Sequence, residues 1–330
     1  MLDKTVSIIM PTLNANNWVG ETLKSVIALN YPVELLEVIV VDDGSTDSTV
    51  DVVKLTLGGS RLRWRLLASA GRGPSAARNA GLAVCGTEWV QFLDADDLID
   101  PNKLAVQLRT DSVNDPDVAV IYSPWQRWSV DPSGRWGGIG PVHQPNVGAN
   151  AVEELISGGN FIATGSQIFR RPWLDRVGGF DENRMLIEDV HLALRIAMQG
   201  GLFVRTETSE PLFYYRQVPG SYSRRDPVGF YRALGDNAYL AQQFWEGQEG
   251  GITARQRELV LAEYASVMRG SRVLNVQLFD DVFRRARTLE SGWLPWDRTP
   301  VVWLSRVMGY RTAEQFASHL VCIRKKVAGW

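Results

Sequence analysis

The stretch WVQFLDADD, residues 89–97, decides the fold because an apolar run passes directly into a cluster of carboxylates. Trp89 to Leu93 predicts a buried strand, and Asp94-Ala95-Asp96-Asp97 follows at its end. Carboxylates crowded at a strand end repel one another and lose hydration, so a cation is expected among them. The favoured cation is a divalent metal that holds a phosphate. The alternative is a helix start in which Asp97 caps the residues that follow.

Upstream of this stretch, short β-rich runs alternate with helical patterns. Strands are predicted at Val6–Met10, Val38–Val41 and Trp64–Leu67. A first helix is predicted from Val19 until Pro32, and a third over Pro74–Val84. Between them, Ser45 is predicted to cap a second helix that has Val50, Val53 and Leu57 on one face. This alternation predicts an α/β fold with a mostly parallel sheet flanked by helices. Ligands are then expected beyond the carboxyl ends of the strands, where both acidic clusters stand.

The regular alternation of strands and helices ends after residue 117. Further strands are predicted at Val118–Tyr122, Trp125–Val130 and Phe161–Phe169, and near Leu202 and Leu212; a turn is predicted at Asp131–Gly134, a long surface loop over Gly137–Gly148, and a helix over Glu188–Met198. From about Pro227 onward the pattern is mainly helical. The chain therefore reads as an α/β region followed by a helical region.

Composition narrows the functional class. A net charge of −2 over 330 residues gives no cationic face for a phosphate backbone, so nucleic acid is not expected as a partner. The two cysteines, Cys85 and Cys322, have no metal-binding spacing and fit a reducing, cytoplasmic setting. No run approaches the roughly 18 apolar residues that cross a bilayer, and the N-terminal residues do not resemble a signal peptide.

Four segments carry the strongest functional signal: Pro11-Thr12-Leu13-Asn14, Asp42-Asp43-Gly44-Ser45, Asp94-Ala95-Asp96-Asp97 and Glu188-Asp189. With the stretches SIIMPTLN, VVDDGSTDST, GPSAARNAGL and GGFDENRMLIEDVHLALR, their order resembles the family 2 inverting glycosyltransferases of the nucleotide-diphospho-sugar transferase superfamily. The likeness runs from about Val6 to Ser223. Each motif alone has a high false-positive risk, whereas four in order make coincidence improbable.

The resemblance implies a GT-A fold, which is a Rossmann-like mixed and mostly parallel sheet flanked by helices, with a C-terminal helical extension. It implies a catalytic domain at 1–226, with a nucleotide-binding half at 1–117 and an acceptor half at 118–226, and a helical region at 227–330. The implied activity is transfer of a sugar from a nucleotide-diphosphate sugar to a saccharide, lipid-linked or other hydroxyl acceptor, as in the synthesis of surface polysaccharides and glycoconjugates.

The donor nucleotide is expected at the first two strand ends. Asp43 can accept hydrogen bonds from a ribose hydroxyl or a base N–H. Pro11, Thr12 and Asn14 form the first loop, which is expected to lie against the base. In the resembling family the acidic residue that corresponds to Asp43 contacts the nucleoside, and UDP is the default donor nucleotide because it is the commonest among the relatives.

The diphosphate is expected at the acidic cluster. Asp96 is the first candidate to bind Mn or Mg, matching the DxD motif of the family, and Asp94 is assigned to the ribose, the metal or a metal-bound water. Asp97 is assigned to support or to a helix cap. Arg78 has two expected roles, bracing these carboxylates or reaching a phosphate, against the alternative of an ordinary structural ion pair.

Asp189, with Glu188 beside it, is the candidate general base. Direct inversion requires one carboxylate to take the proton of the attacking hydroxyl. The pair opens a helix in the family's EDxxLxxR pattern, which Leu192 and Arg195 complete. Alone, an acidic residue there is explained as a cap by the helix dipole.

The chain also departs from the family pattern. Val218 stands near the position where relatives often carry a histidine that assists the metal or the diphosphate. Arg216, Ser221, Tyr222 and Ser223 could form a lid over the diphosphate. The QxxRW signature of processive synthases is absent from the sequence, which favours transfer of a single sugar.

The tail from Trp293 to Trp330 mixes tryptophans with basic residues. This mixture suits peripheral contact with the inner face of a membrane, but the preferred interpretation is helices packed on the catalytic domain or on a second subunit.

The sequence also bears on two other functions. A nucleotidyltransferase of similar fold would need a Gly-rich, lysine-containing phosphate loop after the first strand, and Pro11-Thr12-Leu13-Asn14 provides none. A non-catalytic nucleotide- or sugar-binding module would bind a donor without turning it over.

Overall fold

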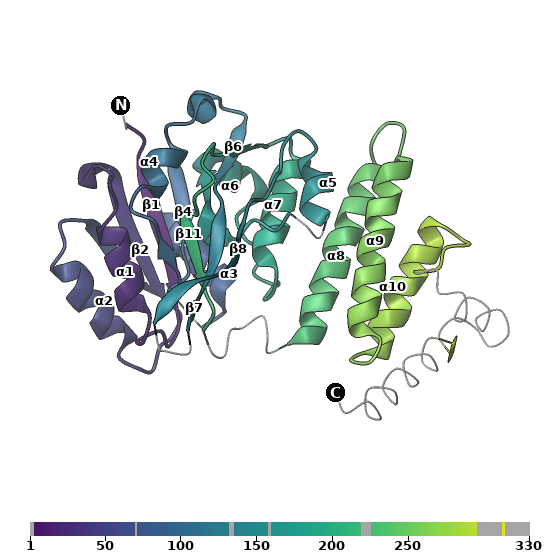
Figure 1. Cartoon of the computed structure of the whole chain (residues 1–330), viewed down its shortest axis with the longest axis horizontal. Helices are drawn as coiled ribbons and strands as arrows, with labels where there is room; N and C mark the ends of the chain where they lie inside the picture. Colours follow the sequence, from purple (N-terminus) through teal and green to yellow (C-terminus); the bar gives the residue numbers. More distant parts are fainter. Residues whose placement is uncertain are drawn as a thin grey trace. The chain divides into compact units, whose positions relative to one another are not determined.

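The chain divides into two units, Met1–Arg225 and Asp226–Trp330. The computed structural model describes residues 3–69, 71–131, 135–157, 160–218, 226–295 and 312–313. Figure 1 colours the chain from its N-terminus to its C-terminus and labels most of its helices and strands.

The first unit is built on a seven-stranded sheet of order β10-β6-β9-β4-β1-β2-β3. Its strands are β1 Val6–Thr12, β2 Leu36–Asp42, β3 Arg63–Ala68, β4 Trp89–Phe92, β6 Val118–Tyr122, β9 Gln167–Arg170 and β10 Leu202–Arg205. Neighbouring strands are parallel except where β9 pairs with β4 and with β6. The predicted α/β class with a mostly parallel sheet is confirmed.

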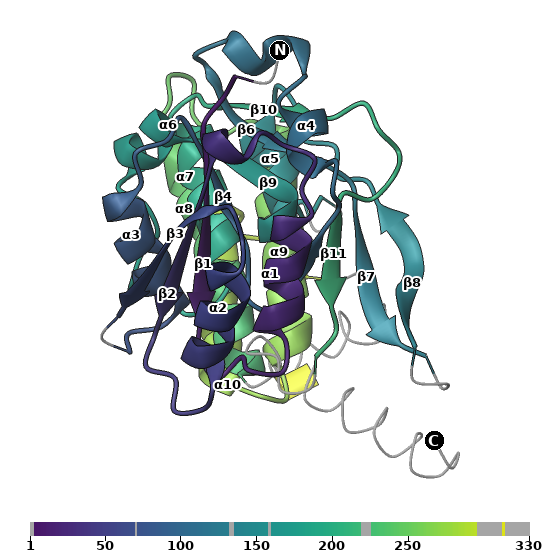
Figure 2. The same cartoon turned by 90° about the vertical axis from the view of Figure 1, so that its left-hand side faces the viewer.

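Helices cover both faces of this sheet (Figure 2). They are α1 Val19–Ile27, α2 Thr49–Gly58, α3 Pro74–Val84, α4 Lys103–Gln107, α5 Ala151–Ile156, α6 Arg171–Val177 and α7 Glu188–Met198, with short 3-10 turns at Val33–Leu35, Asp111–Asn114 and Thr164–Ser166. Successive residues of β1 face opposite ways, so Ile8 and Met10 join the core with α1 and α2, whereas Ile9 joins the core with α3, α6 and α7. Burial on both faces explains why these strands are continuous apolar runs.

A second sheet of four strands has the order β5-β11-β7-β8. Its strands are β5 Leu98–Ile99, β11 Phe213–Arg216, β7 Trp125–Val130 and β8 Trp136–His143. The surface loop predicted over Gly137–Gly148 is wrong for its first half, because β8 pairs antiparallel with β7. β8 is an edge strand, where glycine and proline are tolerated, so its composition imitates a loop. The predicted turn at Asp131–Gly134 falls on residues 132–134, which lie outside the described residues.

Two predicted helix caps are wrong. Asp97 is followed by the short strand β5, and the next helix begins only at Lys103. The second helix begins at Thr49 rather than directly behind Ser45, whose hydroxyl accepts the backbone N–H of Asn14 at 2.9 Å. Both polar side chains serve contacts between distant segments, which the local sequence does not reveal.

In the second unit the described residues form α8 Pro227–Glu246, α9 Ala254–Ser271 and α10 Val276–Leu289, so the helical pattern predicted from Pro227 is confirmed over this range. Among the described residues no helix is both long and apolar enough to cross a membrane. Trp293 is partly buried. The predicted membrane contact depends mainly on tail residues outside the described part of the chain, including Trp296, Trp303 and Trp330.

The packing of α3 on β1 gives a stability prediction. A glycine inside a helix is ordinarily worse than alanine by about 0.5–1 kcal/mol. At Gly81 in α3, however, a Cβ would lie 2.5 Å from Cγ2 of Ile9, so α3 would have to move away from the sheet. We expect Gly81→Ala to lower the free energy of unfolding by about 1–3 kcal/mol, measured by urea denaturation.

Gly58, the last residue of α2, is the matched control, because a Cβ there would meet nothing within 4 Å. Gly58→Ala should be neutral or slightly stabilising. Equal stability changes in the two variants would contradict close packing at Gly81.

Candidate active site

The predicted site residues follow the strand ends at one edge of the large sheet. β1, β2 and β4 are parallel, so the segments after Thr12, Asp42 and Phe92 leave the sheet at the same edge. β9 runs antiparallel to β4, so the turn Thr164–Ser166 that precedes it lies at this edge as well. The turn Thr164–Ser166 therefore lies at the same sheet edge as the acidic cluster, although the two are distant in sequence.

The first two loops are tied together by their own polar side chains. Thr12 is buried and donates its hydroxyl to the carboxylate of Asp42 at 3.4 Å. Asn14, which has a positive φ of 49°, accepts the backbone N–H of Thr46 at 2.9 Å. Pro11 precedes them inside β1. These hydrogen bonds hold the loop after β1 against the loop after β2.

Asp43 is buried just beyond β2 and retains one unused acceptor. Its Oδ2 accepts the backbone N–H of Gly73 at 2.8 Å, at the N-terminal end of α3, where the helix dipole favours a negative charge. Its Oδ1 is buried and has no hydrogen-bond partner among the described residues. A buried acceptor without a donor costs free energy, so this oxygen is suited to a donor group brought by a ligand.

Arg78, in α3, lies buried between two acidic segments. Its Nη2 donates to Oδ1 of Asp94 at 2.6 Å, and its Nη1 donates to Oε1 of Glu188 at 2.7 Å. Burial lowers the pKa of Arg78, but the charges of Asp94 and Glu188 outweigh burial and raise it above its ordinary value. Arg78 therefore makes the contact that was expected of a brace between carboxylates.

The other carboxylates of the acidic cluster bind protons more tightly than usual. Burial and the charge of Asp94 raise the pKa of Asp96 to about 6. Burial and the charges of Asp96 and Asp94 raise the pKa of Asp97 well above its ordinary value. A divalent cation would reverse such shifts, because it favours the charged form of a carboxylate.

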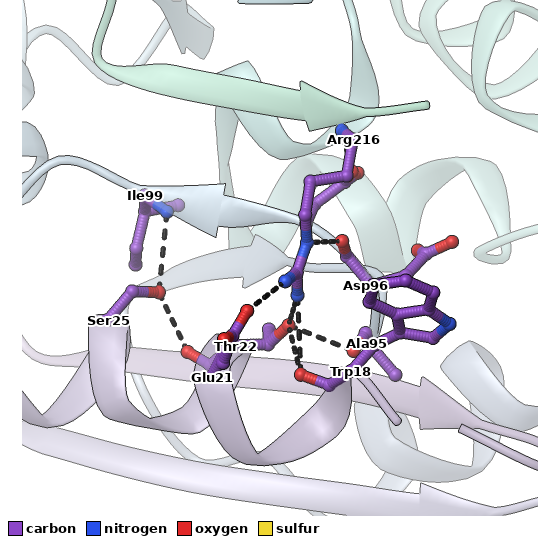
Figure 3. Close-up of polar contacts among 9 residues, drawn as sticks. Trp18, Glu21, Thr22, Ser25, Ala95, Asp96, Ile99 and Arg216 are labelled. Atoms are coloured by element: carbon purple, nitrogen blue, oxygen red, sulfur yellow. Dashed lines mark hydrogen bonds and ion pairs between the residues drawn. The ribbon is translucent and has the colours of Figure 1, made fainter. Parts of the chain in front are cut away.

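Arg216, at the end of β11, fastens the acidic cluster to α1 (Figure 3). Its backbone N–H donates to Oδ1 of Asp97 at 2.8 Å, and its Nε donates to the carbonyl of Asp96. On the other side, Nη1 donates to Glu21 at 2.6 Å and Nη2 donates to Oγ1 of Thr22 at 2.8 Å. The guanidinium thus bridges a strand, a loop and a helix.

The predicted lid is wrong for Arg216, because this side chain is buried among fixed partners. Its other predicted members, Ser221, Tyr222 and Ser223, lie outside the described residues.

Asp189 is held from two directions at the start of α7. Its Oδ1 accepts the backbone N–H of Val190 at 2.8 Å, although the N-cap residue of α7 is Ile187 and not Asp189. Its Oδ2 accepts the hydroxyl of Thr164 at 2.7 Å, from a turn 25 residues away in sequence. Burial raises the pKa of Asp189 above its ordinary value, although both hydrogen bonds oppose this shift. The carboxylate is therefore both positioned and prepared to accept a proton.

The chain enters α7 through a strained residue. Ile187 has φ 57° and ψ 28°, which is the left-handed region. For a β-branched side chain this conformation is a genuine outlier, and such strain concentrates at functional sites. It sets the direction in which Glu188 and Asp189 leave the backbone.

The sequence pattern did not indicate two contacts of this site. Thr164 offered only a weak signal, a small polar residue before a predicted strand, and nothing linked it to Asp189. Arg216 was visible as a cation after an aromatic strand, but its burial and its partners were not.

The acidic cluster fits a divalent metal ion that takes some of its ligands from the substrate. Among the described residues, no group of three or more His, Cys, Asp or Glu side chains is arranged to hold a metal ion. Val218 is buried and offers no ligand atom. Mg²⁺ and Mn²⁺ are often held by one or two carboxylates together with phosphate and water, and the raised pKa of Asp96 fits a carboxylate that such an ion would stabilise.

Solved structures share this fold. The Staphylococcus aureus TarS fragment 1–349 in complex with UDP-GlcNAc matches with a TM-score of 0.67 at 19% identity, over 96% of this chain and 92% of that one. The mannosyltransferase PcManGT from Pyrobaculum calidifontis, in complex with GDP-Man and Mn²⁺, matches with a TM-score of 0.57 at 22% identity, over 98% of this chain and 87% of that one. The predicted GT-A fold is confirmed.

Curated relatives match over shorter stretches. An uncharacterized glycosyltransferase of Rickettsia bellii is 34% identical over 154 residues, which is 47% of this chain and 21% of that protein. The poly(ribitol-phosphate) beta-N-acetylglucosaminyltransferase TarS of Staphylococcus aureus is 36% identical over 98 residues, 30% of this chain and 17% of that protein. This chain therefore spans only about a fifth of the length of these relatives. The model of Glycosyl transferase family 2 matches residues 7–177, which is just over half of the chain. The family predicted from the four motifs is thereby confirmed, and the chain belongs to Glycosyl transferase family 2.

Proposed function

We propose that this chain is an inverting glycosyltransferase that moves a single sugar from a nucleotide-diphosphate sugar, by default a UDP-sugar, to a hydroxyl acceptor. The observation that carries the proposal is the gathering of three differently prepared carboxylate sites around α3 and the sheet edge: the half-free Asp43, the acidic cluster around Asp96, and the positioned Asp189. The nucleoside of a donor, its diphosphate and an attacking hydroxyl need three such receptors.

Asp43 is the proposed receptor for the nucleoside. Its Oδ1 is buried without a donor, and a base N–H or a ribose hydroxyl would supply one. The loops that carry Pro11, Thr12 and Asn14 are proposed to flank the base. TarS and PcManGT were solved with UDP-GlcNAc and GDP-Man respectively, which supports a nucleotide-sugar ligand without choosing its base.

Asp96 and Asp94 are the proposed ligands of a divalent metal. Bound Mn²⁺ or Mg²⁺ would supply Lewis acidity that stabilises the negative charge on the departing diphosphate. Arg78 holds Asp94 in place through its Nη2, and Arg216 holds the backbone of Asp96. These two buried cations keep the cluster assembled while its carboxylates repel one another.

Asp189 is the proposed general base. It takes the proton of the acceptor hydroxyl while the oxygen forms its bond to the anomeric carbon. The bond from that carbon to the diphosphate oxygen breaks, and its electron pair leaves with the diphosphate. Glu188, the other predicted member of the catalytic pair, accepts a hydrogen bond from Arg78. We therefore assign it an auxiliary role beside Asp189, which is consistent with a single displacement with inversion.

The acceptor class is proposed from the relatives alone. TarS is a poly(ribitol-phosphate) beta-N-acetylglucosaminyltransferase, and another relative is the chondroitin synthase of Pasteurella multocida, 32% identical over 129 residues. A saccharide, lipid-linked or other hydroxyl acceptor of surface glycan synthesis is the corresponding proposal for this chain.

Loss of the base gives the central prediction. A thermal-shift screen with UDP, GDP, dTDP and CDP sugars, with and without Mn²⁺, first selects the donor. Asp189→Asn should then lower kcat for nucleoside-diphosphate release by about 10²–10⁴-fold, because its amide cannot take the proton. Donor affinity, measured by calorimetry, should stay within about 2-fold of the original value.

Asp175→Asn is the control for this experiment, because Asp175 pairs with Arg171 on α6, away from the site. Full turnover by Asp189→Asn would refute the assignment of the base. Loss of turnover in both variants would point to unfolding instead, and circular dichroism checks this.

A second prediction concerns the nucleoside. Asp43→Asn removes the charge at α3 and one carboxylate oxygen, so we expect about 10-fold weaker binding of the free nucleoside diphosphate. Isothermal titration calorimetry measures it. Asp51→Asn, on the exposed face of α2, should bind normally; unchanged binding by Asp43→Asn would exclude the nucleoside role.

A third prediction concerns the metal. Because the acidic cluster supplies few ligands, Mn²⁺ alone should bind weakly, whereas Mn²⁺ should strengthen UDP binding by about 10-fold or more. Asp96→Asn should abolish that enhancement, and a chelator should stop turnover. Asp111→Asn, at an exposed position, is the control; an enhancement that survives in Asp96→Asn would remove Asp96 from the metal site.

A further inference from the structure

A lysine is buried in the core below the turn that contacts Asp189. Lys103 has no exposed surface, and it forms no ion pair with a carboxylate among the residues that the structure describes. Its Nζ donates to Oε1 of Gln107 at 2.6 Å and to Oε1 of Gln91. Burial lowers its pKa well below the ordinary value. A buried amine is costly, so its presence calls for a physical reason.

Lys103 sets which way the two glutamine amides face. An amide has an acceptor end and a donor end. Because Nζ meets the oxygen of each amide, the NH2 groups point away from the lysine. Nε2 of Gln91 donates to the carbonyl of Gly165 at 3.2 Å, and Nε2 of Gln107 donates to the carbonyl of Ser166 at 2.9 Å. The lysine thereby fixes two consecutive carbonyls of one turn.

The same turn is restrained from its other side. The backbone N–H of Ser123 donates to the carbonyl of Ser166 at 3.1 Å. Gly165 is pressed against the ring of Phe213, which occupies the space that a Cβ would need. The turn Thr164–Ser166 therefore has little freedom to move. Its first residue donates the hydroxyl that meets Oδ2 of Asp189 at 2.7 Å.

We propose that Lys103, Gln91 and Gln107, which we name the amide cluster, are positioning residues for the general base. They hold the turn Thr164–Ser166 so that the hydroxyl of Thr164 fixes the carboxylate of Asp189 toward the acceptor. This inference rests on the proposed role of Asp189. It assigns a role in the reaction to a buried amine that contacts neither the donor nor the acceptor.

The physical argument is one of distance. General-base transfer requires the carboxylate within hydrogen-bond reach of the hydroxyl proton. A misplacement of about 1 Å can cost about 100-fold in rate. Positioning errors of this kind lower kcat and leave the donor site, held separately by Asp43 and the acidic cluster, unaffected.

The first test removes the hydroxyl alone. Thr164→Val keeps the shape of the side chain, and Thr164→Ser keeps its hydroxyl. With the sugar nucleotide selected by thermal shift as donor and water as acceptor, Thr164→Val should lower kcat about 10-fold to 100-fold with KM for the donor unchanged. Thr164→Ser should restore kcat to within about 3-fold of the original, a rescue that bulk destabilisation does not produce.

The control is Thr87→Val. Thr87 donates to the carbonyl of Trp89 at 2.8 Å just before β4, so it lies at the opposite edge of the sheet from Asp94. It carries a similar hydroxyl with no link to Asp189. If Thr164→Val keeps the same kcat as Thr87→Val, the proposal is overturned.

The second test reaches the amide cluster itself. Lys103→Met should lower kcat at least about 10-fold without changing donor KM. If that variant does not fold, Gln91→Leu, which removes the bond to the carbonyl of Gly165, carries the same expectation. An unchanged kcat in the folded variant overturns the role of the amide cluster.

The two proposals fail separately. If Asp189→Asn retains turnover, the proposed function fails. If Asp189→Asn loses turnover while Thr164→Val matches its control, only the present inference fails.

Discussion

The buried guanidinium of Arg78 is the interaction on which the rest of the site depends. It joins Asp94 to Glu188, two carboxylates that would otherwise repel one another across a poorly hydrated edge. The helix that carries it also presents the backbone N–H of Gly73 to Asp43. One short helix, α3, thus contacts Asp43, Asp94 and Glu188, which belong to the three proposed parts of the site, and it packs closely on β1 at Gly81.

The surroundings of the acidic residues prepare each of them for a different proposed role. Asp43 sits at a helix N-terminus with one free oxygen. Burial and the neighbouring Asp94 raise the pKa of Asp96, and a divalent metal bound to both carboxylates would offset this shift. Asp189 is raised by burial and oriented by Thr164, which suits it to take a proton. In the proposed mechanism, residues of one chemical type therefore acquire three functions from their surroundings.

The local sequence predicted the buried strands and the motifs that follow them. The strands β1, β2 and β4 were visible because burial on both faces makes them continuous apolar runs, and three of the four motifs stand at their ends. β8 was mistaken for a loop because an edge strand tolerates glycine and proline. Thr164 and Arg216 were missed or misjudged because their partners lie 25 and about 120 residues away in sequence, and no spacing rule reaches that far.

The left-handed Ile187 has a consequence for engineering this chain. Glycine would adopt the same backbone at a lower energy, by about 1–2 kcal/mol, so a search for thermostable variants would select against the isoleucine. The same exchange would also loosen the backbone directly before Glu188 and Asp189. Thermal resistance and turnover compete at this residue, which makes it a position to keep fixed when the rest of the chain is stabilised.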